Sequence, residues 1–312
     1  MSFEIINSPI LATIQDKGRF GFSFLGVSNS GCSDEFAYFW ANKLLKNSLD
    51  TNILEISFSN FIIEANKDTQ LSITGANCEF FINEQSKEIW QSYNIKKGDI
   101  IKIGKILSGN LVYLAVLGGF DIKKEFGSNS TTIKEKLGGL DGDKLKKGDE
   151  LPYKKRVCNY TMRLKKEFIP NYEEDLTLRV IFSYQEEYFS KEEKDKFLNS
   201  TYFVTNEFNK MAYKLKGIPI KCQIDGIISE AIAFGSIQIP KDGQPIVLLK
   251  QRQTIGGYPK IGVVLNIDCF KLSQARINTK IRFEEISYEE ALDKSKSFSK
   301  SFFESSAGLK KS

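Results

Sequence analysis

Short apolar runs separated by turn residues dominate this chain. The runs are four to seven residues long, and Gly, Asn, Asp and Ser recur between them. Regular spacing of this kind predicts the short strands of a β-barrel or β-sandwich. We expect strands at Ile53–Phe58, Leu71–Thr74, Ile100–Ile103, Leu111–Leu117, Leu178–Phe182, Tyr202–Thr205, Ala212–Leu215, Ile246–Leu249, Ile261–Ile267 and Ile281–Ile286.

Two helices interrupt the strand pattern, and each begins with polar residues that can cap it. Ser33 and Asp34 precede a segment whose apolar side chains fall on one helical face, at Phe36, Ala37, Trp40, Ala41, Leu44 and Leu45. A capping box begins at Ser190 and predicts a helix that ends near Leu198. We expect another short helix at Tyr288–Lys294, with the rest of the tail loose.

A charged segment with little periodicity, Tyr153–Asp175, divides the chain. We therefore predict an N-terminal half at 1–155, a linker at 156–175, a C-terminal half at 176–286 and a Ser- and Lys-rich tail at 287–312. The length of 312 residues is enough for two ordinary domains. The predicted fold class is mainly β, with a few short helices.

Composition excludes several kinds of chemistry. The chain has no histidine, which removes imidazole metal sites and His-dependent nucleophile systems. Its five cysteines are widely spaced without a C-x-x-C pair, so we expect reduced thiols and no metal site. Cys78, Cys222 and Cys269 fit core positions, whereas Cys32, before the first helix, is also compatible with a functional thiol.

The charge pattern is that of an ordinary soluble protein. The net charge is +5, and the many lysines alternate with Glu and Asp along the whole chain, which is typical of a solvated surface. No basic groove with interleaved aromatic residues indicates nucleic-acid binding. No apolar run approaches the ~20 residues of a membrane helix. We therefore expect a cytoplasmic protein with no nucleic-acid or membrane partner.

The polar turn at 251–260 is the strongest candidate for a ligand site. It places amide, guanidinium, hydroxyl, phenol and ammonium groups between two apolar runs. Arg252 or Lys260 suits a carboxylate or phosphate, and Thr254 with the backbone at 255–257 can donate to a developing oxyanion. Gln238 and Glu230 precede this region and are expected to converge on it. The alternative is a polar turn that only braces a barrel.

A second candidate loop lies near the N-terminus, where glycines cluster around Asp16, Arg19 and Asp34. Arg19 is suited to a carboxylate, although a structural Asp16–Arg19 salt bridge is the alternative. Glu55 lies within a strand, where it either faces solvent or lines a cavity. Gly75 ends a strand in a stretch that suits either an anion-binding backbone or a hairpin turn.

Several longer motifs in this order resemble the family of the 5-oxoprolinase C subunit, also described as allophanate hydrolase subunit 2 or the carboxyltransferase domain of urea carboxylase. The resemblance covers roughly 10–286. The motifs include Gln15-Asp-Lys-Gly-Arg-Phe-Gly21, Ser30-Gly-Cys-Ser-Asp34, Thr74-Gly-Ala76, Ser236-Ile-Gln-Ile-Pro240 and Arg252-Gln-Thr-Ile-Gly-Gly-Tyr-Pro-Lys260. It implies two cyclophilin-like β-barrel domains with a ligand groove.

The resemblance also implies a subunit of an ATP-dependent 5-oxoprolinase, which converts 5-oxoproline, ATP and water to glutamate with subunits A and B-like proteins. ATP, with Mg²⁺, would bind here or at a partner subunit, and the substrate would carry a carboxylate or amide. The expected catalytic residues are Asp16, Arg19, Asp34, Glu55, Arg252, Thr254 and Lys260. The expected substrate-binding residues are Gln238, Gln253, Gly256, Gly257, Tyr258 and Gly75.

Two other functions stay open at this point. The first is the carboxyltransferase component of a biotin-dependent urea or amide carboxylase or an allophanate hydrolase; biotin belongs only to this alternative. The second is a non-catalytic binding partner that antagonises a kinase inhibitor, as the resemblance implies for some members. Sequence identifies neither the exact substrate nor the acid or base.

Overall fold

The computed structural model describes residues 1–154, 156, 160–303 and 309–311. Residues 157–159 of the expected linker and 304–308 and 312 of the expected tail lie outside the described residues. Packing divides the chain into two compact units. The first contains 1–20, 30–172 and the strand at 309–311, and the second contains 21–29 and 173–303. The division therefore falls within the charged segment, at Tyr172–Glu173, and the short stretch 21–29 groups with the second unit.

The strands of the first unit form one 11-stranded sheet, whose path runs β20-β10-β7-β5-β8-β4-β1-β9. Its elements are β1 (Ser2–Asn7), β2 (Leu11–Gln15), α1 (Glu35–Leu44), β3 (Ile53–Ser57), β4 (Phe61–Ala65), β5 (Thr69–Ile82), β6 (Gln85–Ser86), β7 (Gln91–Ile95), β8 (Ile100–Val116), β9 (Glu150–Pro152), β10 (Met162–Leu164) and β20 (Leu309–Lys311), with 3₁₀ turns at Ile133–Glu135 and Lys166–Phe168.

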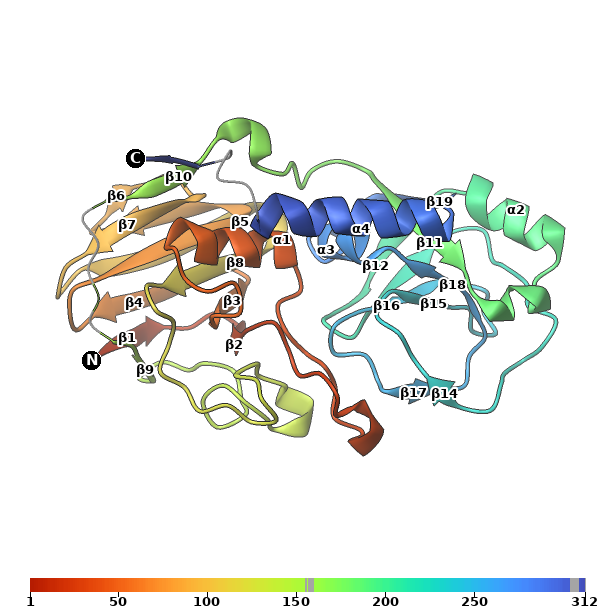
Figure 1. Cartoon of the computed structure of the whole chain (residues 1–312), viewed down its shortest axis with the longest axis horizontal. Helices are drawn as coiled ribbons and strands as arrows, with labels where there is room; N and C mark the ends of the chain where they lie inside the picture. Colours follow the sequence, from red (N-terminus) through yellow and green to blue (C-terminus); the bar gives the residue numbers. More distant parts are fainter. Residues whose placement is uncertain (155, 157–159, 304–308, 312) are drawn as a thin grey trace. The chain divides into compact units, whose positions relative to one another are not determined.

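The long strands β5 and β8 organise this sheet. They pair antiparallel through three register shifts between Gly75 and Phe80, and α1 lies along both strands (Figure 1). The apolar runs Ile100–Ile103 and Leu111–Leu117 were expected as separate strands, but β8 spans both as far as Val116. Pairing with β5 along its length keeps the more polar middle of β8 extended, which an apolar run cannot indicate by itself.

The second unit contains a closed barrel of seven strands, which confirms the barrel prediction for this half. The ring is β11-β18-β15-β16-β13-β12-β19. Its elements are β11 (Leu176–Phe182), α2 (Lys191–Asn199), β12 (Tyr202–Phe208), β13 (Ala212–Lys216), β14 (Glu230–Ala231), β15 (Ser236–Gln238), β16 (Ile246–Leu248), β17 (Ile255–Gly256), β18 (Lys260–Val264), α3 (Asn266–Leu272), β19 (Lys280–Glu285) and α4 (Tyr288–Phe303), with 3₁₀ turns at Ser23–Leu25 and Tyr184–Tyr188.

Alternating side chains of these strands fill the barrel, including Leu178, Val180, Val247 and Ile261, all fully buried. β11 and β19 pair in parallel, while the other ring pairs are antiparallel. The expected strand Ile261–Ile267 was too long, because β18 ends at Val264 and α3 begins at Asn266. An apolar run does not by itself separate the end of a buried strand from the start of a helix.

The C-terminal helix is longer than expected. α4 extends from Tyr288 to Phe303, whereas the prediction ended the helix near Lys294 and left the rest loose. Ser287 and Glu290 form a capping box at its start: Ser287 N donates to Glu290 Oε2 at 3.0 Å, and Glu290 N donates to Ser287 Oγ at 3.2 Å. Ala291 and Ile286 pack with Leu265 in a small apolar cluster, which supplies the tertiary contact that a short isolated helix lacks.

Candidate functional site

Neighbouring strands of the second unit bring Gln238 and Lys260 together. They are register partners at the ends of β15 and β18, beside an irregularity in the pairing. A separate two-stranded ribbon, β14–β17, pairs Glu230 with Gly256. Because β17 and β18 are joined by only three residues, Gly256 and Lys260 stay close in the chain. The barrel and the ribbon therefore position Gln238, Lys260, Glu230 and Gly256 as one group.

Lys260 and Glu230 form an ion pair between Nζ and Oε1. The lysine side chain is only 6% exposed, whereas that of Glu230 is 33% exposed. Gln185 bridges the pair, because its Oε1 accepts from Lys260 N at 2.8 Å and its Nε2 donates to Glu230 Oε1 at 2.7 Å. Hydrogen bonds from Lys260 and then from Tyr184 hold the pKa of Glu230 below its usual range.

Gln238 supplies a buried donor that no described residue uses. Its side chain is 2% exposed, and Nε2 has no hydrogen-bond partner among the described residues. A Cβ at Gly256 would lie 2.9 Å from this nitrogen, 3.0 Å from Gln253 Nε2 and 2.7 Å from Ile232 Cδ1. The two amides and Ile232 therefore pack so closely on the backbone at 256 that only glycine fits there. A buried unpaired amide is costly, so a water molecule or a ligand atom that accepts from Gln238 Nε2 would be stabilising.

The resulting site consists of hydrogen-bond donors, and its one ammonium, that of Lys260, is paired with the Glu230 carboxylate. Two side-chain amides and a neutralised ammonium surround Gly256 and are suited to the oxygens of a carboxylate, an amide or a lactam. The structure brings together five of the predicted site residues here. They are Gln238, Gln253, Gly256, Lys260 and Gly257, which directly follows β17. Tyr258 follows directly and is 43% exposed.

Arg252 and Thr254 have mainly internal contacts. The Arg252 guanidinium donates to Ile232 O at 3.0 Å, to Leu249 O at 3.3 Å and to Asn29 Oδ1 at 3.1 Å. It also lies over the Phe234 ring, and burial lowers its pKa. Thr254 O accepts from Ile232 N at 3.0 Å. Arg252 thus holds Ile232, the residue just after β14, which places it as a support for the Gly256 region.

Asp16 and Arg19 are buried in the first unit and contact the segment 125–132. Asp16 accepts from Gly18 N, Ser128 Oγ, Asn129 N and Ser130 Oγ at 2.6–2.8 Å. Arg19 donates to the carbonyl oxygens of Ser130 and Glu125 and to Thr132 Oγ1. Burial lowers the pKa of Arg19, against an opposing effect of nearby carboxylates, Asp16 first. These contacts indicate that both residues brace the loop.

Asp34 and Glu55 belong to another buried network of the first unit. Asp34 caps α1, since its Oδ1 accepts from Ala37 N at 3.1 Å, and its Oδ2 accepts from Tyr172 Oη at 2.7 Å. Glu55 Oε2 accepts from Ser33 N at 2.7 Å and from Tyr113 Oη at 2.9 Å. Burial, then Glu55 and Asp34, raise the pKa of Tyr113, so its phenol remains a donor.

Gly75 allows this network to pack. Its φ is +93°, and a Cβ there would meet Leu111 O at 2.3 Å and Tyr113 Cδ2 at 3.0 Å. Glycine at this position therefore lets β5 pass close to β8 and leaves room for the Tyr113 ring. The contacts of Gly75 are with protein atoms of the sheet.

Sequence reasoning missed Tyr184 and Gln185 as parts of the group around Lys260. Gln185 lies in a 3₁₀ turn just after β11, where Ser183 Oγ accepts from Gln185 N at 3.3 Å. That turn chemistry was visible in the sequence. Its place beside Glu230, 45 residues later, follows only from the barrel pairing of β11 with β18.

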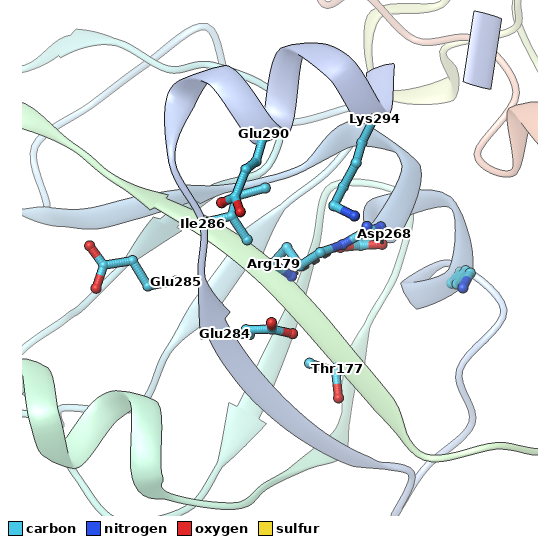
Figure 2. Close-up of a pocket in the computed structure, with 9 residues that line it drawn as sticks. Thr177, Arg179, Asp268, Glu284, Glu285, Ile286, Glu290 and Lys294 are labelled. Atoms are coloured by element: carbon cyan, nitrogen blue, oxygen red, sulfur yellow. Dashed lines mark hydrogen bonds and ion pairs between the residues drawn. The ribbon is translucent and has the colours of Figure 1, made fainter. Parts of the chain in front are cut away.

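A separate hollow of about 460 Å³ lies in the second unit and contains none of the predicted site residues. Its lining is Thr177, Arg179, Asp268, Lys271, Glu284, Glu285, Ile286, Glu290 and Lys294 (Figure 2). Figure 2 shows Arg179 directed at Asp268, which it binds through Nε at 2.8 Å and Nη2 at 2.5 Å. This pair joins β11 to α3, so the arginine already has its carboxylate partner.

Neither a metal-ligand cluster nor a membrane-spanning helix occurs in the described residues. No group of three or more His, Cys, Asp or Glu side chains in this part of the chain is arranged to hold a metal ion. No helix within the described ranges has both the length and the apolar character needed to cross a membrane.

Comparison with known proteins relates the whole fold to one family. The family model described as "Carboxyltransferase domain, subdomain A and B" matches residues 25–285. The 5-oxoprolinase C subunit of Escherichia coli K12 is 33% identical over 294 residues, covering 93% of each chain. The Haemophilus influenzae protein of that name is 30% identical, covering 92% of each. The crystal structure of K. lactis urea amidolyase superposes with a TM-score of 0.90 at 23% identity; 97% of this chain matches one fifth (20%) of that chain.

Proposed function

Since the chain belongs to the family of the carboxyltransferase domain, subdomains A and B, we propose that it is a subunit of an ATP-dependent 5-oxoprolinase. The reaction would open the lactam of 5-oxoproline with water to give glutamate, while ATP is converted to ADP and phosphate. The observation that carries this proposal is the match, over nine tenths of both chains, to relatives named as the C subunit of 5-oxoprolinase. Partners similar to the A and B subunits would complete the enzyme in the cytoplasm.

The group around Gly256 supports this choice of substrate. 5-Oxoproline carries a carboxylate and a lactam carbonyl, and all of their oxygens accept hydrogen bonds. Gln238 Nε2 is a buried donor without a partner in the described part of the chain. Gln253 Nε2 lies close to the same glycine, Gly256. A donor aimed at the lactam oxygen stabilises the negative charge that develops there when water attacks the carbonyl carbon.

Lys260 would contribute the positive charge of the site. Its ion pair with Glu230 fixes the ammonium, and the 33% exposure of Glu230 leaves that carboxylate accessible. A substrate carboxylate would share the lysine with Glu230 and gain a charge-assisted hydrogen bond. The chain has no GxxxxGK[ST] sequence, so ATP with Mg²⁺ would bind by other means on this chain or on a partner subunit.

Carboxyl transfer is the second candidate, because the family model and K. lactis urea amidolyase both point to that class. Under this alternative, biotin would carry the carboxyl group to an amide. The chain assembled with its A- and B-like subunits separates the two functions: glutamate release from 5-oxoproline that depends on ATP supports the proposal. Urea-dependent ATP turnover that needs a biotinylated partner, with no glutamate release, favours the alternative.

A further inference from the structure

The ammonium of Lys260 has hydrogen-bonding capacity that the described residues do not use. Its Nζ donates to Glu230 Oε1, and the other two N–H groups have no acceptor in the described part of the chain. The side chain is only 6% exposed, so bulk water offers little compensation. Its register partner across the barrel strands, Gln238, has the unpaired Nε2. A ligand with several acceptor atoms would therefore be stabilised beside these two residues.

The Glu230 carboxylate is held in place but keeps access to water. Lys260 Nζ, Gln185 Nε2 at 2.7 Å and the Tyr184 hydroxyl donate to it. An ionised carboxylate offers about four acceptor positions, so these three donors leave room for a further one. The Glu230 side chain is 33% exposed, against 6% for Lys260, so solvent reaches the pair from the carboxylate. A water molecule can therefore bind to an oriented carboxylate here.

We propose that Glu230 is the general base and Lys260 the general acid in the ring opening of 5-oxoproline. The inference rests on the proposed function and assigns roles within the same site. In this substrate the carboxylate and the lactam nitrogen are bonded to the same carbon atom. The two unused N–H groups of Lys260 therefore match a carboxylate oxygen and the nitrogen. Gln238 Nε2 suits the lactam oxygen, which lies on the other side of the nitrogen. Glu230 holds the attacking water.

The proton balance of this step closes within the pair. As water attacks the lactam carbon and the O–C bond forms, one water proton passes to Glu230. The nitrogen of the tetrahedral intermediate is no longer conjugated with a carbonyl, so it accepts a proton from Lys260 Nζ as the C–N bond breaks. The neutral lysine then takes the proton from Glu230 across their hydrogen bond, which restores the ion pair. The new carboxyl and amino groups reach their charged forms by exchange with solvent.

The surroundings of Glu230 favour this direction of transfer. Hydrogen bonds from Lys260 and then Tyr184 lower the pKa of Glu230, so the carboxylate is ionised at neutral pH and able to accept a proton. A carboxyl group of low pKa also passes its proton readily to a neutral amine, which is the stronger base. Gln185 is the positioning residue, because its Oε1 accepts from Lys260 N at 2.8 Å while its Nε2 donates to Glu230.

The test uses Glu230→Gln in the full chain assembled with A- and B-like subunits, because the amide keeps an acceptor for Lys260 but cannot take a proton. Glu193→Gln is the matched control, since Glu193 on α2 also binds a lysine, Lys196, through Oε1 at 2.5 Å. We expect Glu230→Gln to lose at least about 100-fold in kcat for ATP-dependent glutamate release, with KM within about threefold. Glu193→Gln should keep kcat within about twofold, and the two variants should have similar thermal midpoints.

Chemical rescue separates a general base from a simple counter-ion of the lysine. Glu230→Ala removes a carboxylate whose side chain is 33% exposed, so a small anion can reach Lys260 from solvent. Sodium formate should raise the kcat of this variant at least about tenfold. Sodium chloride supplies an anion that pairs with the ammonium but is too weak a base to take a proton from water, so it should leave kcat unchanged. Equal rescue by both salts would overturn the assignment.

The remaining outcomes separate this inference from the proposed function. An active assembly in which Glu230→Gln keeps its kcat, or raises KM alone, would leave the proposed function standing and overturn the general-base assignment. An assembly of the original chain that releases no glutamate would reject the proposed function and, with it, the roles of both residues.

Discussion

Gln238 and Lys260 are partners across neighbouring barrel strands, and both are buried, but only the lysine has a charged partner. Lys260 is tied to Glu230, while Gln238 Nε2 has no hydrogen-bond partner in the described part of the chain. The fold therefore satisfies one of two adjacent polar groups. The other, Gln238 Nε2, is free to donate to an acceptor that binds there.

Gln238→Leu is predicted to separate binding from stability. Removing an unpaired buried amide should leave the free energy of unfolding unchanged or raise it by up to ~1 kcal/mol. The same change should raise the KM for 5-oxoproline about tenfold, which equals ~1.4 kcal/mol. Urea denaturation and steady-state kinetics of the assembled enzyme measure the two effects.

Gln70→Leu is the matched control, because Gln70 is buried and its Nε2 donates to Tyr160 O at 2.6 Å and Asn94 Oδ1 at 3.2 Å. It should lower the free energy of unfolding by roughly 1–2 kcal/mol. Equal destabilisation by Gln238→Leu would mean that Gln238 serves the fold.

Gly256→Ala should force apart the side chains packed on Gly256. The new Cβ would lie 2.7 Å from Ile232 Cδ1 and 2.9 Å from Gln238 Nε2, so those side chains must move. We expect a loss of roughly 1–3 kcal/mol in stability and a KM increase of about tenfold or more. Gly226→Ala is the control, because its new Cβ would meet only Gly257 O, at 3.3 Å. It should change KM by less than twofold. Similar kinetics for both variants would argue against a ligand at Gly256.

Acid titration tests the Lys260–Glu230 pair. The pKa of Glu230 is lowered in the folded protein, so the pair stabilises fully above the usual glutamate value of about 4.3. That contribution is lost as pH falls through the lower, folded-state value. The difference in unfolding free energy between the original chain and Lys260→Met should thus be constant from pH 7 to about 5 and shrink below about 4. Denaturation curves showing a difference that grows on acidification would contradict the assignment.

Asp16→Asn should act on stability. The carboxylate accepts four hydrogen bonds, three of them from the 128–130 segment, and an amide cannot accept all of them. We expect a loss of roughly 2–3 kcal/mol in unfolding free energy with an unchanged KM. The exposed Asp143→Asn is the control and should leave the unfolding free energy unchanged within error. Unchanged stability with abolished turnover would return Asp16 to a catalytic role.

Local signals in the sequence were sufficient for many elements. Asp34 caps α1 as expected, and Ser190 Oγ accepts from Glu193 N at 3.4 Å at the start of α2. Of the three cysteines expected in the core, Cys78 and Cys269 are buried, whereas Cys222 is only partly buried against the barrel core. Burial raises the pKa of Cys269 well above its usual value. Cys32 is buried too, beneath the start of α1.

Contacts between distant segments explain the rest. Asp16 and Arg19 were considered as ligand residues or as a mutual salt bridge, yet most of their described side-chain hydrogen bonds join residues more than 100 positions later. Gln185 reaches Glu230 only because β11 and β18 are neighbours. Spacing along the chain contains no information on such pairs. The density of donors singled out the turn at 251–260, and Gly256 and Lys260 do lie beside Gln238. A ligand at this turn stays a prediction.

Glutamate release by the assembled enzyme is the most direct test of the central claim that Lys260 serves 5-oxoproline hydrolysis. The chain, Lys260→Met and the exposed control Lys241→Met, whose lysine pairs with Asp225, are each combined with A- and B-like subunits. With ATP and 5-oxoproline, Lys260→Met should lose at least about 100-fold in kcat/KM, or ~2.7 kcal/mol, while Lys241→Met stays within twofold. Full ATP-dependent glutamate release by Lys260→Met would contradict the claim.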